Sequence, residues 1–153
     1  MRIENLAQHP HLIKSIVSTL HASWSELPPW SEKSAIRARL EAGASEALFP
    51  HTVVAVTDNG DLAATGSVKL CELPNHPDKT HWVGEIFVLP QYRNQGLGSR
   101  LTTTLTAYAF AHGVSRIYLY TPDQQALYKR LGWQNVCTDT ANNEVVSIMV
   151  LTS

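Results

Sequence analysis

The chain has 153 residues, of which 44% are hydrophobic and 16% charged, and its formal net charge is −1 at pH 7. This length suits one globular domain with a sizeable core. The near-neutral charge, with no basic run, argues against nucleic-acid binding, and no apolar stretch approaches the ~20 residues that span a bilayer. We therefore expect one domain over residues 1–153 that binds neither nucleic acid nor membrane.

The cysteines and histidines show no spacing typical of a metal site. Cys71 and Cys137 lie far apart and form no CxxC pair, and the seven histidines form no HxxxH motif. The N-terminal segment also lacks the basic, apolar and small-residue order of a signal peptide. We expect free thiols, no metal and a cytoplasmic location.

The first part of the chain predicts one strand and two helices. Residues 2–6 suit a short edge strand, and apolar residues at helical spacing predict an amphipathic helix over 10–27. Ser31 is the predicted N-cap of a second helix over 32–42, with Gly43 directly after it. Because the apolar face of this second helix is thin, we expect it at the rim of the fold.

From residue 52 the apolar period changes to that of strands. Strands over 52–57 and 62–70 flank Asp58-Asn59-Gly60-Asp61, a strong hairpin-turn pattern. Residues 71–80 contain two prolines and are expected to form a loop. The segment 82–88 then predicts the central strand.

The C-terminal half predicts further helices and strands. A helix over 97–112 precedes a strand over 114–120, a short helix ends at Leu131, and strands over 133–136 and 144–151 form an antiparallel pair. Since a helix connects the central strand to the strand over 114–120, these two must run parallel. The predicted class is α/β: a mixed, largely antiparallel sheet with helices on both faces.

The stretch 85–101 holds the most informative pattern. A short buried strand, Ile86-Phe87-Val88-Leu89, is followed by Arg93-Asn94-Gln95-Gly96-Leu97-Gly98 and the start of a helix. The first turn of a helix has unpaired N–H donors, and glycines allow a diphosphate to come close. A dinucleotide fingerprint would need a glycine at Leu101, and the Lys of a Walker loop is missing after Gly98. The pattern predicts a phosphate site of another kind.

This loop resembles the R/Q-x-x-G-x-G/A signature of the GNAT superfamily of acyl-CoA-dependent N-acetyltransferases. The segment Ala126-Leu127-Tyr128-Lys129-Arg130-Leu131-Gly132-Trp133 resembles the second signature of that family, Ala-x-Tyr-x-x-x-Gly-Phe, with Trp133 in place of phenylalanine. The two signatures occur in the family's order. The resemblance implies a GNAT fold, in which two parallel strands splay apart and acetyl-CoA lies between them.

Carried over position by position, the resemblance also implies a set of cofactor-binding residues. The loop would hold the diphosphate, the central strand would pair its backbone with the pantetheine, and the N–H of Val88 would polarise the thioester carbonyl. Thr121 stands where many members carry an asparagine and offers a hydroxyl instead. The implied residues are Ile86, Phe87, Val88, Arg93, Asn94, Gln95, Gly96, Leu97, Gly98, Ser99 and Thr121.

Acyl transfer to an amine needs a proton donor for the leaving thiolate and a proton acceptor for the amine. Tyr128 matches the general acid of the family, with a core aromatic residue as the alternative. An amine of pKa about 10 is mostly protonated at neutral pH, so we expect a base or a water chain. Glu85 is the first candidate, because it is the only carboxylate within the central strand, and His81 is the second. A strand-end carboxylate that faces solvent is the alternative for Glu85.

The resemblance thus implies an N-acetyltransferase that uses acetyl-CoA and acts on a primary amine of a small molecule or a peptide N-terminus. The acceptor would be framed by residues 24–30, the loop over 71–80 and the terminal hairpin, with Trp24, Trp30 and Trp82 at the rim. A non-catalytic acyl-CoA-sensing domain of the same fold is the alternative. A homodimer is left open.

Overall fold

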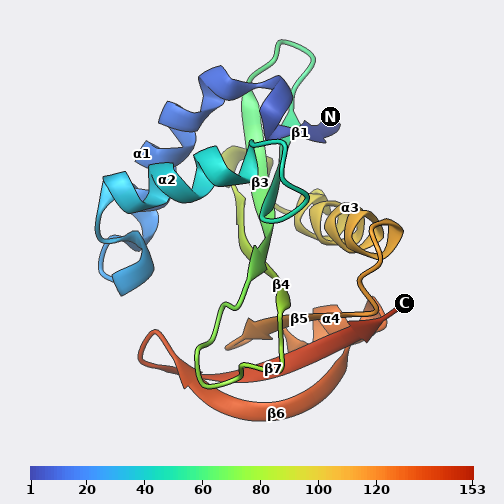
Figure 1. The fold of residues 1–153 in the computed structure, drawn as a ribbon. Helices are drawn as coiled ribbons and strands as arrows, with labels where there is room; N and C mark the ends of the chain where they lie inside the picture. The colour runs from blue at the N-terminus through green and yellow to red at the C-terminus, as the bar shows by residue number, and fades with distance from the viewer.

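The computed structural model describes residues 1–153 and contains seven strands and four α-helices. Their arrangement in space is drawn in Figure 1. The helices are α1 (Ile13–Trp24), α2 (Lys33–Gly43), α3 (Leu97–Ala111) and α4 (Gln125–Arg130). The strands are β1 (Arg2–Asn5), β2 (His51–Val56), β3 (Leu62–Leu70), β4 (His81–Val88), β5 (Arg116–Thr121), β6 (Gln134–Ala141) and β7 (Glu144–Thr152). None of the helices is long and apolar enough to cross a membrane.

The strands form one mixed sheet in the order β1-β2-β3-β4-β5-β7-β6. All neighbours are antiparallel except β4 and β5, which run parallel as predicted. Their ladder consists of one residue pair, Trp82 with Tyr118, whereas β5 pairs with β7 over six residues. Figure 1 shows the two strands running in different directions beyond this contact. The predicted α/β class and the splayed parallel pair are therefore confirmed.

Two apolar clusters hold helices against the two faces of the sheet. Leu97, Leu101 and Leu105 of α3 are buried with residues of β2, β3 and β5 in one cluster. The other cluster joins α1 and α2 to the opposite face. Within it Ile36 and Leu40 of α2 are 0% and 2% exposed. The prediction that α2 lies at the rim is therefore wrong, because its thin apolar face is buried in this cluster with residues of α1 and β2.

Two further boundaries differ from the predictions. Ser31 is not the N-cap of α2, because Glu32 occupies that position and the Ser31 hydroxyl donates to the Pro28 carbonyl at 3.0 Å. Strand β6 runs to Ala141 rather than to residue 136, so that a tight turn at Asn142-Asn143 joins it to β7. Both asparagines have positive φ, which this residue type tolerates in hairpin turns.

Candidate active site

A β-bulge interrupts β4, the strand that was predicted to be central. Thr65 pairs with Phe87 and Ser67 with Gly84, so Glu85 and Ile86 lie together opposite Gly66. Glu85 has φ of 54°, a conformation that a non-glycine residue rarely adopts. A Cβ on Gly66 would clash with the Ile86 side chain. Glycine at position 66 therefore leaves room for the Ile86 side chain, and the bulge redirects β4 where β5 has already separated from it.

A groove of about 580 Å³ follows the exposed end of β4 to the start of α3. Gly96 is the N-cap of α3 with φ of 75° and no side-chain cap, which leaves the first-turn N–H groups without side-chain partners. A Cβ on Gly96 would meet no atom within 4 Å, and one on Gly98 would meet only Ile86 Cγ2 at 3.9 Å. The two glycines thus keep open the space above a helix N-terminus, which is an anion-binding geometry.

The edge of β4 beside this groove has backbone groups that β5 does not pair. Leu89 N–H donates to the Ala63 carbonyl of β3 at 2.9 Å. Because successive residues of a strand direct their backbone groups to opposite sides, those of Val88 face the unpaired edge. The Val88 carbonyl accepts a hydrogen bond from Arg93 Nε at 2.9 Å, while the guanidinium lies 5.5 Å from the Phe87 ring centroid. Arg93 therefore links the glycine loop to β4.

The structure brings together all predicted cofactor-binding residues except Gln95 and Thr121, which do not line the groove. Thr121 is buried, and its hydroxyl accepts the N–H of Gln124 at 3.0 Å, so it stabilises the turn before α4. Sequence reasoning missed the lining residues Tyr92, Gln124 and Leu127. Gln124 is the N-cap of α4 and Leu127 follows three residues later, a spacing that could have placed these two on one side of the helix start.

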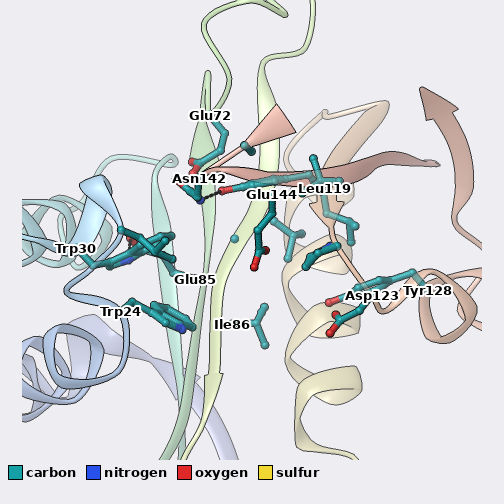
Figure 2. Close-up of a pocket in the computed structure, with 17 residues that line it drawn as sticks. Trp24, Trp30, Glu72, Glu85, Ile86, Leu119, Asp123, Tyr128, Asn142 and Glu144 are labelled. Carbon is teal, nitrogen blue, oxygen red and sulfur yellow. Dashed lines mark hydrogen bonds between the residues drawn. The ribbon is translucent and has the colours of Figure 1, made fainter. Parts of the chain in front are cut away.

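A second cavity of about 410 Å³ lies beside the groove, and Trp24 and Ile86 border both. Figure 2 shows Trp24 and Trp30 on one side of it, and Tyr128 and Asp123 on the other. The β6–β7 hairpin contributes Asn142 and Glu144, and Glu72 comes from the loop after β3. The three segments predicted to frame the acceptor do line one cavity.

Tyr128 lies in α4 with its hydroxyl directed into the cavity, as Figure 2 shows. Burial raises the pKa of this phenol, the Asp123 carboxylate raises it further, and the hydroxyl of Thr102 acts in the opposite direction. A raised pKa keeps the phenol protonated at neutral pH. Tyr128 is therefore a neutral hydroxyl that faces the space between the two walls.

The chain matches the model of the acetyltransferase (GNAT) family over residues 13–133. It belongs to this family. The GNAT fold is shared with the aminoglycoside 6'-N-acetyltransferase from Enterococcus faecium, at 18% identity and a TM-score of 0.72 over 99% of this chain and 97% of that one. It is also shared with yncA from Salmonella typhimurium, solved with its cofactor acetyl-CoA, at 17% identity and a TM-score of 0.74 over 99% and 93% of the two chains.

Within this GNAT fold the predicted base Glu85 is buried, with 4% of its side chain exposed. Its Oε1 accepts hydrogen bonds from Trp30 Nε1 at 3.0 Å and from Arg39 at 2.9 Å, and Lys69 Nζ lies at 3.5 Å. Lys69 also pairs with Glu72 at 2.9 Å. The alternative that Glu85 faces solvent is therefore wrong, because this carboxylate is enclosed by an ion-pair cluster.

The remaining charges of the cavity are negative. No Lys, Arg or His lines it, and Asp123 and Glu144 make no ion pair. Burial, together with the charges of Glu72 and Glu85, raises the pKa of Tyr120 to about 12, although Asn142 donates a hydrogen bond to its hydroxyl at 3.2 Å. Tyr120 is thus a neutral part of the wall.

Two predicted site residues lie away from both cavities. His81 begins β4 and packs edge-on against Phe49, with 4.7 Å between the ring centroids. It lines neither the groove nor the cavity. Trp82 is fully buried between the two sheet halves, so the prediction that it lies at the acceptor rim is wrong. No group of three or more His, Cys, Asp or Glu side chains could hold a metal ion.

Proposed function

We propose that this protein is an N-acetyltransferase that transfers the acetyl group of acetyl-CoA directly to a primary amine of a small molecule or a peptide. One observation carries the proposal: the glycine-loop groove and the acidic cavity meet at Trp24 and Ile86, where β4 and β5 have separated. The family membership and the acetyl-CoA in the related yncA structure support the identity of the donor.

The residues of the groove suit acetyl-CoA, which would supply an activated thioester carbonyl. The N–H groups of Gly98 and Ser99 in the first turn of α3 would hold the diphosphate. The unpaired edge of β4 would bind the pantetheine amides as an added strand. The N–H of Val88 would stabilise the negative charge that develops on the carbonyl oxygen.

Tyr128 would act as the general acid that protonates the leaving sulfur. Its raised pKa supports this role, because the phenol keeps its proton until the thiolate forms. A positioned general acid contributes about 10²–10⁴ to a rate. The direction of its hydroxyl, into the cavity beside the groove, supports the same assignment.

The attacking amine also needs a group that accepts its proton. Glu85 stays a prediction in this role, but its Oε1 already accepts hydrogen bonds from two donors. Asp123 and Glu144 line the same cavity and carry no ion-pair partner, so each is an alternative base. A water chain is the further alternative.

A positively charged acceptor fits the cavity best. Asp123 and Glu144 supply uncompensated negative charge, and the aromatic faces of Trp24 and Trp30 suit cations. Aminoglycosides are amines of this kind, and aminoglycoside acetyltransferases are among the proteins that share the fold. An acetyl-CoA turnover assay against a panel of aminoglycosides, small amines and peptides tests the proposal, and no turnover of any member would contradict it.

A non-catalytic acyl-CoA sensor is the second candidate function. Tyr128 facing the cavity argues against it, because a sensor needs no proton donor there. Thermal-shift titrations with acetyl-CoA, CoA and ATP separate these candidates from a nucleotide-binding domain: the first two ligands should raise Tm and ATP should not.

A cytoplasmic location and a homodimer stay predictions. Cys71 and Cys137 are free and exposed, which suits a reducing compartment. Size-exclusion chromatography with light scattering measures the oligomeric state.

A further inference from the structure

An ionic cluster joins five segments of the chain around Glu85. We call Trp30, Arg39, Lys69, Glu72 and Glu85 the Glu85 cluster. Glu85 of β4 binds Trp30 of a 3₁₀ turn, Arg39 of α2 and Lys69 of β3, and Lys69 binds Glu72 of the following loop. Two cations and two carboxylates balance one another, and three of these four charged side chains are at most 12% exposed.

The cluster holds one wall of the acceptor cavity. The Trp30 indole donates to Glu85, and Arg39 Nη2 donates to the Pro29 carbonyl at 2.7 Å. The Trp30 ring packs on Trp24 with 4.9 Å between centroids, and Trp24 packs edge-on against Phe87 at 5.3 Å. These contacts connect the Glu85 carboxylate to the ring of Trp24, which borders both the acceptor cavity and the glycine-loop groove.

The cations of the cluster lie outside the acceptor cavity. Arg39 and Lys69 line a separate cavity of about 380 Å³. Glu85 lies between this cavity and the acceptor cavity and borders each of them. Neither cation therefore contacts an acceptor held beside Tyr128, and either one can affect the reaction only through the residues that it holds.

The Glu85 cluster also accounts for the unusual backbone at the bulge. A non-glycine residue with positive φ persists only where the surrounding structure holds it. The carboxylate of Glu85 is tied to α2, to β3 and to Trp30, so its backbone is held from three directions. The adjoining Ile86 lies where the acceptor cavity meets the glycine-loop groove.

We propose that Glu85 is a positioning residue: through Arg39 and Trp30 it fixes the Trp24–Trp30 wall, and so sets where the acceptor amine lies relative to the cofactor groove. This inference rests on the proposed acetyltransferase function. It assigns Glu85 a role in acceptor placement, in contrast to proton transfer.

The kinetic test compares Glu85→Gln, Arg39→Met and the double variant. Each single variant should raise the acceptor KM about tenfold, the effect of losing one charge-assisted hydrogen bond, and leave the acetyl-CoA KM unchanged. The ratio of variant to wild type should be constant from pH 6 to 9. Because the two residues act as a unit, the double variant should be no worse than either single one.

Two further variants complete this comparison. Arg37→Met removes an exposed arginine of the same helix, which pairs with Glu41, and should leave all constants unchanged. Trp30→Phe keeps an aromatic ring but loses the donor to Glu85, and should raise the acceptor KM in a folded protein even if Arg39→Met fails to fold. If the Glu85→Gln defect lay in kcat and shrank as pH rises while Arg39→Met behaved like wild type, Glu85 would be the base and the inference would be overturned.

A measurement without turnover tests the wall itself. The indole N–H signals in a ¹H–¹⁵N NMR spectrum are assigned with Trp24→Phe, Trp30→Phe and Trp133→Phe. Glu85→Gln and Arg39→Met should shift the signals of Trp30 and Trp24 and leave that of Trp133, which packs near Tyr128, in place. An unmoved Trp24 signal would overturn the inference. A wild type that showed no thermal shift with acetyl-CoA would overturn the proposed function instead, and the NMR result would still decide whether Glu85 holds the wall.

Discussion

Trp82 and Tyr118 form the single register pair between β4 and β5, with their ring centroids 5.6 Å apart. Trp82 is fully buried and donates its indole N–H to the Lys79 carbonyl at 2.8 Å. Lys79 in turn places its ammonium 5.6 Å from the Tyr118 ring centroid. This contact joins the two halves of the sheet at one point, and the separation beyond it leaves the β4 edge available to a ligand.

The first prediction concerns the glycine loop. Gly98→Val should weaken CoA binding by at least about a hundredfold, because the added side chain enters the groove above the first turn of α3. We choose Gly98 over Gly96 because Gly96 has positive φ, where any side chain adds strain. Isothermal titration with CoA measures the affinity.

The control for this variant lies on the same helix. Ala107→Val places the same β-branched side chain on the exposed face of α3, away from the groove. It should bind CoA like wild type. Wild-type affinity in a folded Gly98→Val protein would leave the glycine as a structural residue and remove the diphosphate assignment.

The second prediction concerns the leaving group. Tyr128→Phe keeps the ring and removes the proton donor, so kcat should fall about tenfold to a thousandfold while the KM for acetyl-CoA hardly changes. Because the pKa of Tyr128 is raised from its ordinary value of 10, deprotonation of this phenol should lower the wild-type kcat only above pH 10. This decline should be absent in the variant. Steady-state and single-turnover kinetics separate chemistry from product release.

Tyr108→Phe is the matched control for Tyr128→Phe. Its hydroxyl donates to the Leu48 carbonyl at 2.8 Å and lies outside both cavities. This variant should lose some stability but no activity. An unchanged single-turnover rate in Tyr128→Phe would exclude Tyr128 from the chemistry.

Most of the sheet could be predicted because its elements have regular apolar periods and clear turn signals. The glycine loop also identified the groove, because the need for small residues at a helix N-terminus leaves a local pattern. Strand β6 was predicted too short because its edge position leaves Thr138, Asp139 and Thr140 outside the core, without apolar alternation. A polar edge strand looks like a loop in the sequence.

The environment of Glu85 could not be predicted, because it depends on distant partners. Arg39 lies 46 residues and Trp30 lies 55 residues before it. The side of the strand on which Glu85 lies also depends on the bulge, which shifts the alternation by one residue. The acidic residues Asp123 and Glu144 meet at the cavity for the same reason, since they belong to separate elements that tertiary structure brings together.

The third prediction concerns stability and pH. His51 is 7% exposed, and its ring stacks on Tyr108 with 3.6 Å between centroids. Burial lowers the pKa of His51 from its ordinary value of 6.5, and the charge of His112 lowers it further. The unfolded chain therefore binds this proton more readily than the folded one. The contribution of His51 to the free energy of unfolding is therefore fully present above pH 6.5, the pKa of the unfolded chain. It is lost as the pH falls from there through the lower pKa of His51 in the folded protein.

The free energy of unfolding should thus increase from pH 5 to pH 7, with His81, whose pKa burial also lowers, contributing in the same direction. His51→Phe should make this dependence shallower. Urea denaturation at fixed pH values measures it, and the variant His11→Gln, at an exposed position, should keep the wild-type slope. A His51→Phe protein with an unchanged slope would show that the dependence arises elsewhere.

The last prediction concerns the charge of the acceptor. Figure 2 shows the Glu144 carboxylate directed into the cavity, and it has no ion-pair partner. If the acceptor is cationic, Glu144→Gln should raise its KM about two- to fivefold, the range expected for an exposed charge pair, and leave the KM for acetyl-CoA alone. Added salt should raise the wild-type acceptor KM and affect the variant less, because screening weakens the same attraction.

Glu46→Gln removes an equal charge at an exposed position outside both cavities and should match wild type. If Glu144 is the base instead, kcat of Glu144→Gln should fall most at low pH and recover as the amine loses its own proton near pH 10. An unchanged acceptor KM, salt dependence and kcat profile would exclude both roles and leave Asp123 as the carboxylate to test.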